Sequence, residues 1–168
     1  MHEPSDYWTE FAERLAALGV KTRLIGALAA MQYRAQPRVT TDVDFLAASL
    51  DGVPDALRAA GYECEVVSDA DGEPFAVFVR GKGHRVDILK AETEYQRQVL
   101  DRGTGPAITV EDVVVHKLIA WRPRDRDDVA QIFAAGCALD ESYIEHWAET
   151  WEVEDRWAEA KRIFARPE

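Results

Sequence analysis

The segment Arg38-Val-Thr-Thr-Asp-Val-Asp-Phe-Leu46 decides the fold that we predict for this chain. Its apolar residues predict a short strand over 42–46, and alternate residues of a strand point to the same face of a sheet. Asp42 and Asp44 therefore present two carboxylates side by side, although like charges repel. Mg²⁺ would offset that repulsion, because it binds oxygen ligands from one or two carboxylates together with substrate phosphates. The alternative is a strand end with two solvated aspartates.

A third acid lies in another apolar strand. The run 85–89 places Asp87 between Val86 and Ile88, and a charged residue inside an apolar strand is rarely present for packing. If this strand pairs beside strand 42–46, three carboxylates converge on one face of the sheet.

Hydrophobic periodicity and turn residues predict an α+β protein. The predicted strands are 23–25, 42–46, 63–67, 75–79 and 85–89, the last three as an antiparallel meander. The predicted helices are a first one between an N-cap at Ser5 and a stop at Gly19, then 26–31, 55–60, 92–100, 109–121 and 127–135, with one or two more within 142–164. We expect one domain over 1–136, and a C-terminal helical extension over 137–168 that packs on it.

The composition narrows the function. The 168 residues have a net charge of −11, and 47% of them are hydrophobic, as in an ordinary globular protein. A broad grip on DNA or another nucleic-acid backbone needs many Lys and Arg contacts, so the charge disfavours it. Basic residues gather only locally, within 117–126.

The sequence also gives expectations for localisation and for the two cysteines. The sequence contains no apolar run long enough to span a membrane, and its first residues lack the features of a signal peptide, so we expect a cytoplasmic protein. Cys64 and Cys137 lie far apart in apolar or small-residue surroundings, and we expect two buried thiols rather than a disulfide or a metal site.

Two other segments could contact a phosphate. Strand 23–25 runs directly into Gly26-Ala27 and a helix, a turn that presents backbone N–H groups to an anion. Simple close packing of a small residue explains the same feature. In the helix 109–121, Lys117 lies within an apolar stripe, from which its ammonium could reach water, the carboxylates or a bound phosphate.

Together these segments resemble the polymerase-β-like nucleotidyltransferase superfamily, and most closely its AbiEii/AbiGii toxin-like branch. The resemblance covers roughly residues 20–135. The motifs that produce it are, in chain order, Gly26-Ala27, Arg38-x-Thr40-x-Asp42-x-Asp44, Val86-Asp87-Ile88, Glu111-Asp112, Lys117-Leu118 and Arg124-Asp125-Arg126-Asp127-Asp128.

The resemblance implies a small mixed β-sheet flanked by helices, and transfer of a nucleoside monophosphate from an NTP with two Mg²⁺ ions. It also implies a role as the toxin of a toxin–antitoxin or phage-defence system, with a cognate antitoxin as a partner. The residues that it implies are Asp42, Asp44 and Asp87 for metal binding and catalysis, Lys117 and Asp128 for catalysis, and Gly26, Ala27, Arg38, Thr40, Lys117, Arg124 and Asp125 for nucleotide binding.

The sequence also departs from the superfamily pattern. Gly26-Ala27 stands where Gly-Gly or Gly-Ser is usual, so a hydroxyl contact is lost while backbone donation remains. The fourteen residues 28–41 separate this pair from Asp42, a longer spacing than in the minimal nucleotidyltransferases that act as antitoxins. The acceptor stays open between RNA or tRNA, a protein and a small molecule.

Two other functions are compatible with the same residues. One is a non-catalytic module with a nucleotidyltransferase fold that senses a nucleotide or binds a partner protein. The other is metal-dependent hydrolysis of phosphodiesters, which the low positive charge disfavours.

Overall fold

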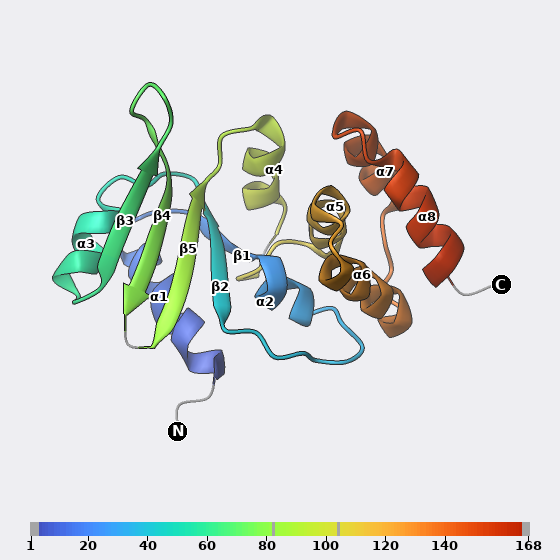
Figure 1. Ribbon diagram of the computed structural model, residues 1–168, viewed down its shortest axis with the longest axis horizontal. Helices are drawn as coiled ribbons and strands as arrows, with labels where there is room; N and C mark the ends of the chain where they lie inside the picture. Colours follow the sequence, from blue (N-terminus) through green and yellow to red (C-terminus); the bar gives the residue numbers. More distant parts are fainter. Residues whose placement is uncertain (1–3, 82, 104, 166–168) are drawn as a thin grey trace. The chain divides into compact units, whose positions relative to one another are not determined.

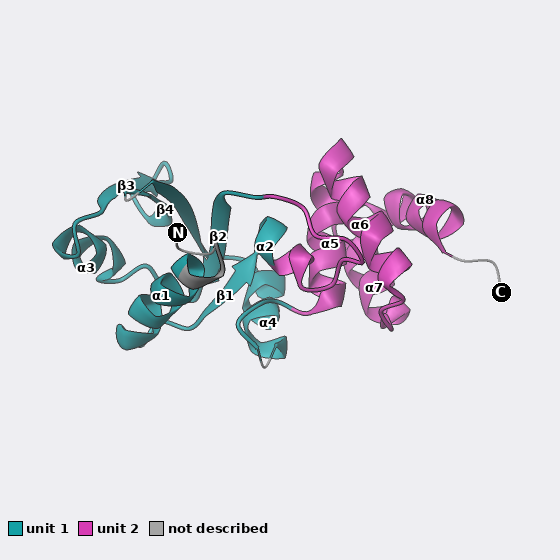
Figure 2. Ribbon diagram, turned by 90° about the horizontal axis from the view of Figure 1, so that it is seen from below, with its two compact units in different colours: residues 1–28, 40–108 teal, residues 29–39, 109–168 magenta. Residues whose placement is uncertain are grey.

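The structure is a computed structural model that describes residues 4–81, 83–103 and 105–165. The chain forms two units, one of residues 1–28 and 40–108 and the other of residues 29–39 and 109–168 (Figure 2). The predicted start of the C-terminal extension at residue 137 lies inside the second unit.

The first unit is built on a five-stranded mixed sheet, as predicted (Figure 1). Only the β2–β5 pair is parallel, and the successive strands β3, β4 and β5 form the predicted antiparallel meander. The strands are β1 (Thr22–Ile25), β2 (Asp42–Ala47), β3 (Glu63–Ser68), β4 (Pro74–Gly81) and β5 (His84–Lys90), in the order β1-β2-β5-β4-β3.

One face of this sheet forms the core of the first unit. Val43 and Phe45 of β2 and Val86 and Ile88 of β5 alternate with polar positions and are buried. Phe11 of α1 (Pro4–Ala17) lies over them, with its ring centroid 6.4 Å from that of Phe45. The short helix α3 (Val53–Ala59) contacts β3.

The opposite face bears the acidic positions of β2 and β5. Arg23 of β1 lies on this face, and its guanidinium donates to the backbone carbonyls of Leu100, Gly103 and Gly105 at the end of α4 (Glu94–Arg102). Helix α4 also contacts β2. Because Thr93 caps this helix through a capping box with Gln96, it begins two residues later than predicted.

The second unit is helical. Helix α5 (Val110–Ala120) begins after its N-cap Thr109, whose hydroxyl accepts a hydrogen bond from the Asp112 amide. The C-terminal segment forms two helices, α7 (Glu141–Thr150) and α8 (Glu154–Phe164), and α2 (Gly26–Met31) runs from the first unit into the second.

The predicted start of helix α6 (Pro123–Ala135) was wrong by four residues. The polar segment 122–128 had suggested a turn before a helix at Asp127. Pro123 instead occupies the first helical turn, where its fixed φ is favourable and no N–H is needed. As a result, Asp125 and Asp128 lie on the helix and are buried.

Both cysteines are free thiols, as predicted, but Cys64 and Cys137 are half-buried rather than fully buried. Within the described residues, none of the helices combines the length and the apolar character needed to cross a membrane.

Candidate active site

The three residues predicted to bind metal occupy neighbouring positions of the sheet in the first unit. The parallel pairing of β2 with β5 sets Asp44 directly beside Asp87, and Asp42 beside Arg85. All four residues lie on one face of the sheet, because paired residues of neighbouring strands point the same way. The Cα atoms of Asp42 and Asp44 are roughly 6.6 Å apart, and those of Asp44 and Asp87 about 4.8 Å. The strand pairing on which their convergence depended is therefore present.

Gly26 lies against this carboxylate group. Its φ of +66° is in the left-handed region, which side-chain-bearing residues rarely adopt. A Cβ atom here would be 3.2 Å from Asp44 Cγ and closer still to its Oδ2. The neighbouring Ile25 pairs with Asp44 across β1 and β2, which explains the close approach. Both the backbone angle and the space thus require glycine, while its predicted contact with a triphosphate stays a prediction.

Asp87 already has a cationic partner. The Arg85 guanidinium donates from Nε to Oδ1 of Asp87 at 3.1 Å and from Nη2 to Oδ2 at 2.9 Å. The two residues are neighbours on the same strand face, since they are two positions apart on β5. The cluster that we call the carboxylate square thus consists of Asp42, Asp44, Asp87 and Arg85.

The carboxylate square suits a hard divalent cation in the chemistry of its donors, but not yet in their arrangement. Asp42 is exposed, whereas Asp44 and Asp87 are half-buried, so oxygen ligands are accessible from one side. Among the described residues, however, no group of three or more His, Cys, Asp or Glu side chains is arranged to hold a metal ion. Arg85 occupies both oxygens of Asp87. A metal ion held by all three acids would therefore compete with Arg85 for the oxygens of Asp87.

The second unit contains a separate ionic cluster that includes several other predicted site residues. The Lys117 ammonium of α5 lies 3.1 Å from Asp125 Oδ1 and 2.8 Å from Asp128 Oδ2, both on α6. Lys117 is 5% exposed, Asp125 1% and Asp128 0%. We use the name ionic cluster for Lys117, Asp125 and Asp128 together with the arginines that bind them, which are Arg34, Arg38 and Arg122.

Asp128 is the centre of the ionic cluster. Arg38 donates to both of its carboxylate oxygens, at 3.0 and 3.1 Å, and Arg34 also binds Oδ1. Burial alone would raise the pKa of Asp128, but the hydrogen bonds from Arg38 and Lys117 outweigh it and lower that pKa. For Asp125, burial likewise acts upward, and the hydrogen bonds from Arg122 and Lys117 bring the pKa below its usual value.

These lowered pKa values predict how stability depends on pH. A carboxyl group with a lower pKa in the folded state stabilises the protein above its ordinary pKa of about 4, and that contribution is lost as the pH falls further. We expect the gap in free energy of unfolding between wild type and Asp128→Asn, measured in urea, to be constant from pH 7 to 5 and to narrow toward pH 3. A gap that stays constant down to pH 3 would contradict this assignment.

The remaining predicted residues fall within these two units. Ala27 and Thr40 are half-buried residues of the first unit, and Arg124 is exposed on α6 in the second. The sequence reasoning missed Arg34 and Arg85. For Arg85 a signal was available, because it lies two residues before Asp87 on a strand. For Arg34 there was none, since its partner Asp128 is 94 positions away.

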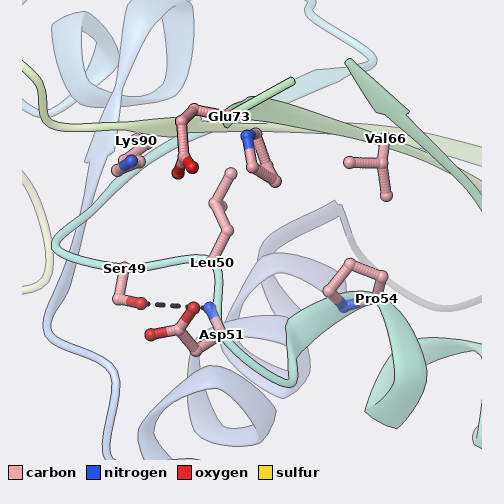
Figure 3. Close-up of a pocket in the computed structure, with 8 residues that line it drawn as sticks. Ser49, Leu50, Asp51, Pro54, Val66, Glu73 and Lys90 are labelled. Atoms are coloured by element: carbon pink, nitrogen blue, oxygen red, sulfur yellow. Dashed lines mark hydrogen bonds between the residues drawn. The ribbon is translucent and has the colours of Figure 1, made fainter. Parts of the chain in front are cut away.

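A pocket of about 320 Å³ lies beyond the C-terminal ends of β2 and β5 (Figure 3). Its lining combines the cation of Lys90 with the carboxylates of Asp51 and Glu73 and with apolar side chains. Asp42 and Asp44 lie in the opposite half of β2. The pocket is therefore distinct from the carboxylate square, and we assign it no part in the chemistry below.

Comparison with known proteins identifies the fold. No family model matches the sequence, and no curated protein matches it significantly. Among solved structures, an antigenic nucleotidyltransferase-like protein from Paracoccidioides brasiliensis has a TM-score of 0.55 at 15% identity, covering 98% of this chain and 94% of that one. The antibiotic-resistance factor ANT(2'')-Ia has a TM-score of 0.55 at 11% identity, with 89% and 90% covered. JHP933 from Helicobacter pylori has a TM-score of 0.52 at 16% identity, with 95% and 77% covered.

The chain thus has a nucleotidyltransferase-like fold, as the sequence motifs predicted. At this level of identity the comparisons establish the architecture alone. They do not separate the AbiEii/AbiGii toxin-like branch from other proteins of this fold.

Proposed function

We propose that this protein is a metal-dependent nucleotidyltransferase that moves a nucleoside monophosphate from an NTP to an acceptor hydroxyl. The observation that supports it most is the carboxylate square on the paired strands β2 and β5, with the Gly26 turn directly against Asp44. Phosphoryl transfer depends mainly on positioning and charge neutralisation, so carboxylates and backbone donors suffice without a nucleophilic side chain. The fold is that of nucleotidyltransferase-like proteins.

In this proposal Asp42, Asp44 and Asp87 would hold Mg²⁺ through their carboxylate oxygens. The metal would supply charge neutralisation for the triphosphate and for the pyrophosphate leaving group. Asp87 would accept the proton of the acceptor hydroxyl. The acceptor oxygen would then bond to the α-phosphorus as the bond to the bridging oxygen breaks, which releases pyrophosphate.

The residues of the ionic cluster have a sufficient structural role in the second unit. Lys117 pairs there with Asp125 and Asp128, and Asp128 also accepts hydrogen bonds from arginines, so a catalytic or nucleotide-binding role for Lys117 and Asp128 stays a prediction of the sequence resemblance. The same resemblance is the basis for proposing a toxin of a toxin–antitoxin or phage-defence system. A toxin of this kind would modify an RNA or a protein of the cell, and a cognate antitoxin would bind it.

The test is a transfer assay with purified protein, Mg²⁺, each α-labelled NTP in turn, and total RNA or cell lysate as acceptor. We expect label on RNA or on protein with at least one NTP. We also expect EDTA to abolish the labelling and added Mg²⁺ to restore it, because the carboxylates alone cannot neutralise a triphosphate. Label on a small molecule, separated by thin-layer chromatography, would place the acceptor in that class instead.

The second candidate is a non-catalytic module that binds a nucleotide. The Arg85–Asp87 ion pair favours it, because a side chain of the protein itself neutralises the charge of Asp87. In that case calorimetry would detect nucleotide binding while no NTP and no acceptor gave labelled product.

A further inference from the structure

The carboxylate square contains its own cation. Three carboxylates on one sheet face repel one another, and Arg85 is the basic residue that lies among them. Its guanidinium holds both oxygens of Asp87 in the bidentate geometry that gives the stronger ion pairs.

Arg85 and a divalent metal ion would compete for the same atoms. A metal ion bound by Asp87 needs lone pairs of the two oxygens to which Nε and Nη2 of Arg85 donate. The metal ion and the guanidinium are also both positive, so each disfavours the other at this site. The guanidinium therefore weakens the binding of a metal ion to Asp87.

We propose that Arg85 is a built-in counter-cation of the carboxylate square, which competes with a divalent metal ion for Asp87 and so lowers the metal affinity of the site. The inference rests on the metal site of the proposed function and adds a residue that sets its affinity. Arg85 is a positioning residue in this scheme, because it acts through the orientation of Asp87. When not bound to Asp87, the planar guanidinium of Arg85 would remain beside the site, where its N–H donors suit phosphate oxygens.

The size of the effect follows from the exposure of the pair. The Arg85 side chain is 47% exposed and that of Asp87 18%, so water screens their attraction in part. We therefore expect removal of the guanidinium to tighten metal binding by about three- to tenfold, rather than by orders of magnitude.

The test is a titration of the full chain with Mn²⁺ in the absence of nucleotide, with free Mn²⁺ measured by electron paramagnetic resonance. Arg85→Gln should bind Mn²⁺ about three- to tenfold more tightly than wild type. Arg85→Lys, which keeps the charge but loses the fork, should lie between the two. The matched control is Arg80→Gln on β4, because Arg80 is the direct cross-strand neighbour of Arg85 on the same sheet face. Its Mn²⁺ affinity should change less than about twofold.

Two results would overturn the inference. If Arg85→Gln bound Mn²⁺ as tightly as wild type or more weakly, Arg85 would not compete with the metal ion. If Arg80→Gln tightened Mn²⁺ binding as much as Arg85→Gln does, the cause would be the general surface charge and not Arg85. The ¹⁵N resonance of Arg85 Nε gives a second readout, since it should shift on Mg²⁺ addition as the hydrogen bond to Asp87 weakens.

The failure of this inference is distinguishable from failure of the proposed function. If wild type transfers nucleotides with Mg²⁺ while Arg85→Gln leaves the Mn²⁺ affinity unchanged, only the role of Arg85 is wrong. If Asp44→Asn binds Mn²⁺ as well as wild type does, the metal site is wrong and both proposals fail with it.

Discussion

Replacing Asp44 by asparagine should reduce nucleotidyl transfer by about 10²- to 10³-fold or more, while the protein stays folded. Asparagine keeps the shape of the side chain and removes its charge, so the β2–β5 pairing is retained and the metal site loses a central ligand. Asp44 is central because Asp42 precedes it on the same strand face and Asp87 is its direct neighbour on β5. The measurement is the rate of label transfer from the preferred NTP at saturating Mg²⁺.

The stability of Asp44→Asn should be equal to or higher than that of wild type. Removing one of three neighbouring carboxylates relieves like-charge repulsion, so the urea midpoint should not fall. This opposite movement of activity and stability is typical of a functional cluster rather than a structural one. A drop in both together would mean that Asp44 serves the fold.

The chain provides a matched control for this variant in Glu65. It lies on the same sheet face, in the row that runs from Asp44 through Asp87 and Phe78 to β3. Glu65→Gln removes an equal charge from this row outside the carboxylate square, and should leave transfer within about twofold of wild type. If Glu65→Gln reduced transfer as strongly as Asp44→Asn, the general charge of this face would be the cause, and the assignment to Asp44 would fail.

The sequence predicted the carboxylate cluster because strand geometry has a short and regular period. Asp42 and Asp44 share a face at any strand position, and an acid between Val86 and Ile88 has no packing role. The parallel pairing that brings Asp87 beside Asp44 depended on a long-range contact, and it entered the prediction only as a condition. The structure confirms that pairing.

The environment of each charge could not be predicted in the same way. Lys117 was read as a single cation near an apolar stripe, whereas it is bound between two acids of α6. These two acids are buried because helix α6 begins at Pro123, four residues before the predicted start. Which charged side chains form ion pairs depends on where helices begin and on segments distant in sequence. Local sequence patterns define neither.

Replacing Asp128 by alanine should destabilise the second unit by about 3–5 kcal/mol, the largest stability effect that we expect in this protein. Asp128 is fully buried, and three cations bind it: Lys117, Arg34 and Arg38. Without the carboxylate these cations stay largely buried and lose a shared partner. Breaking a buried ion pair costs more than the pair contributes, because it leaves charge uncompensated. Urea unfolding at pH 7, followed by helical circular dichroism, measures the change.

Asp127→Ala is the control for Asp128→Ala, because it removes a neighbouring acid of α6 that is not buried. Its side chain is 54% exposed, and its Oδ2 accepts a hydrogen bond from Nη2 of Arg34, at 2.9 Å. Asp127→Ala should therefore cost less than about 1 kcal/mol, as exposed ion pairs usually do. Equal losses for the two variants would contradict a special role for the buried carboxylate.

Lys117→Met should lower the free energy of unfolding by an amount between the losses for Asp127→Ala and Asp128→Ala. This ranking tests which residue is the centre of the ionic cluster. In that variant Asp125 retains Arg122, and Asp128 retains Arg34 and Arg38, so each buried acid keeps a cationic partner. Methionine also fills most of the space of the lysine stem. If Lys117→Met cost more than Asp128→Ala, the lysine rather than Asp128 would be the centre of the cluster, and the arginines would contribute little to neutralising it.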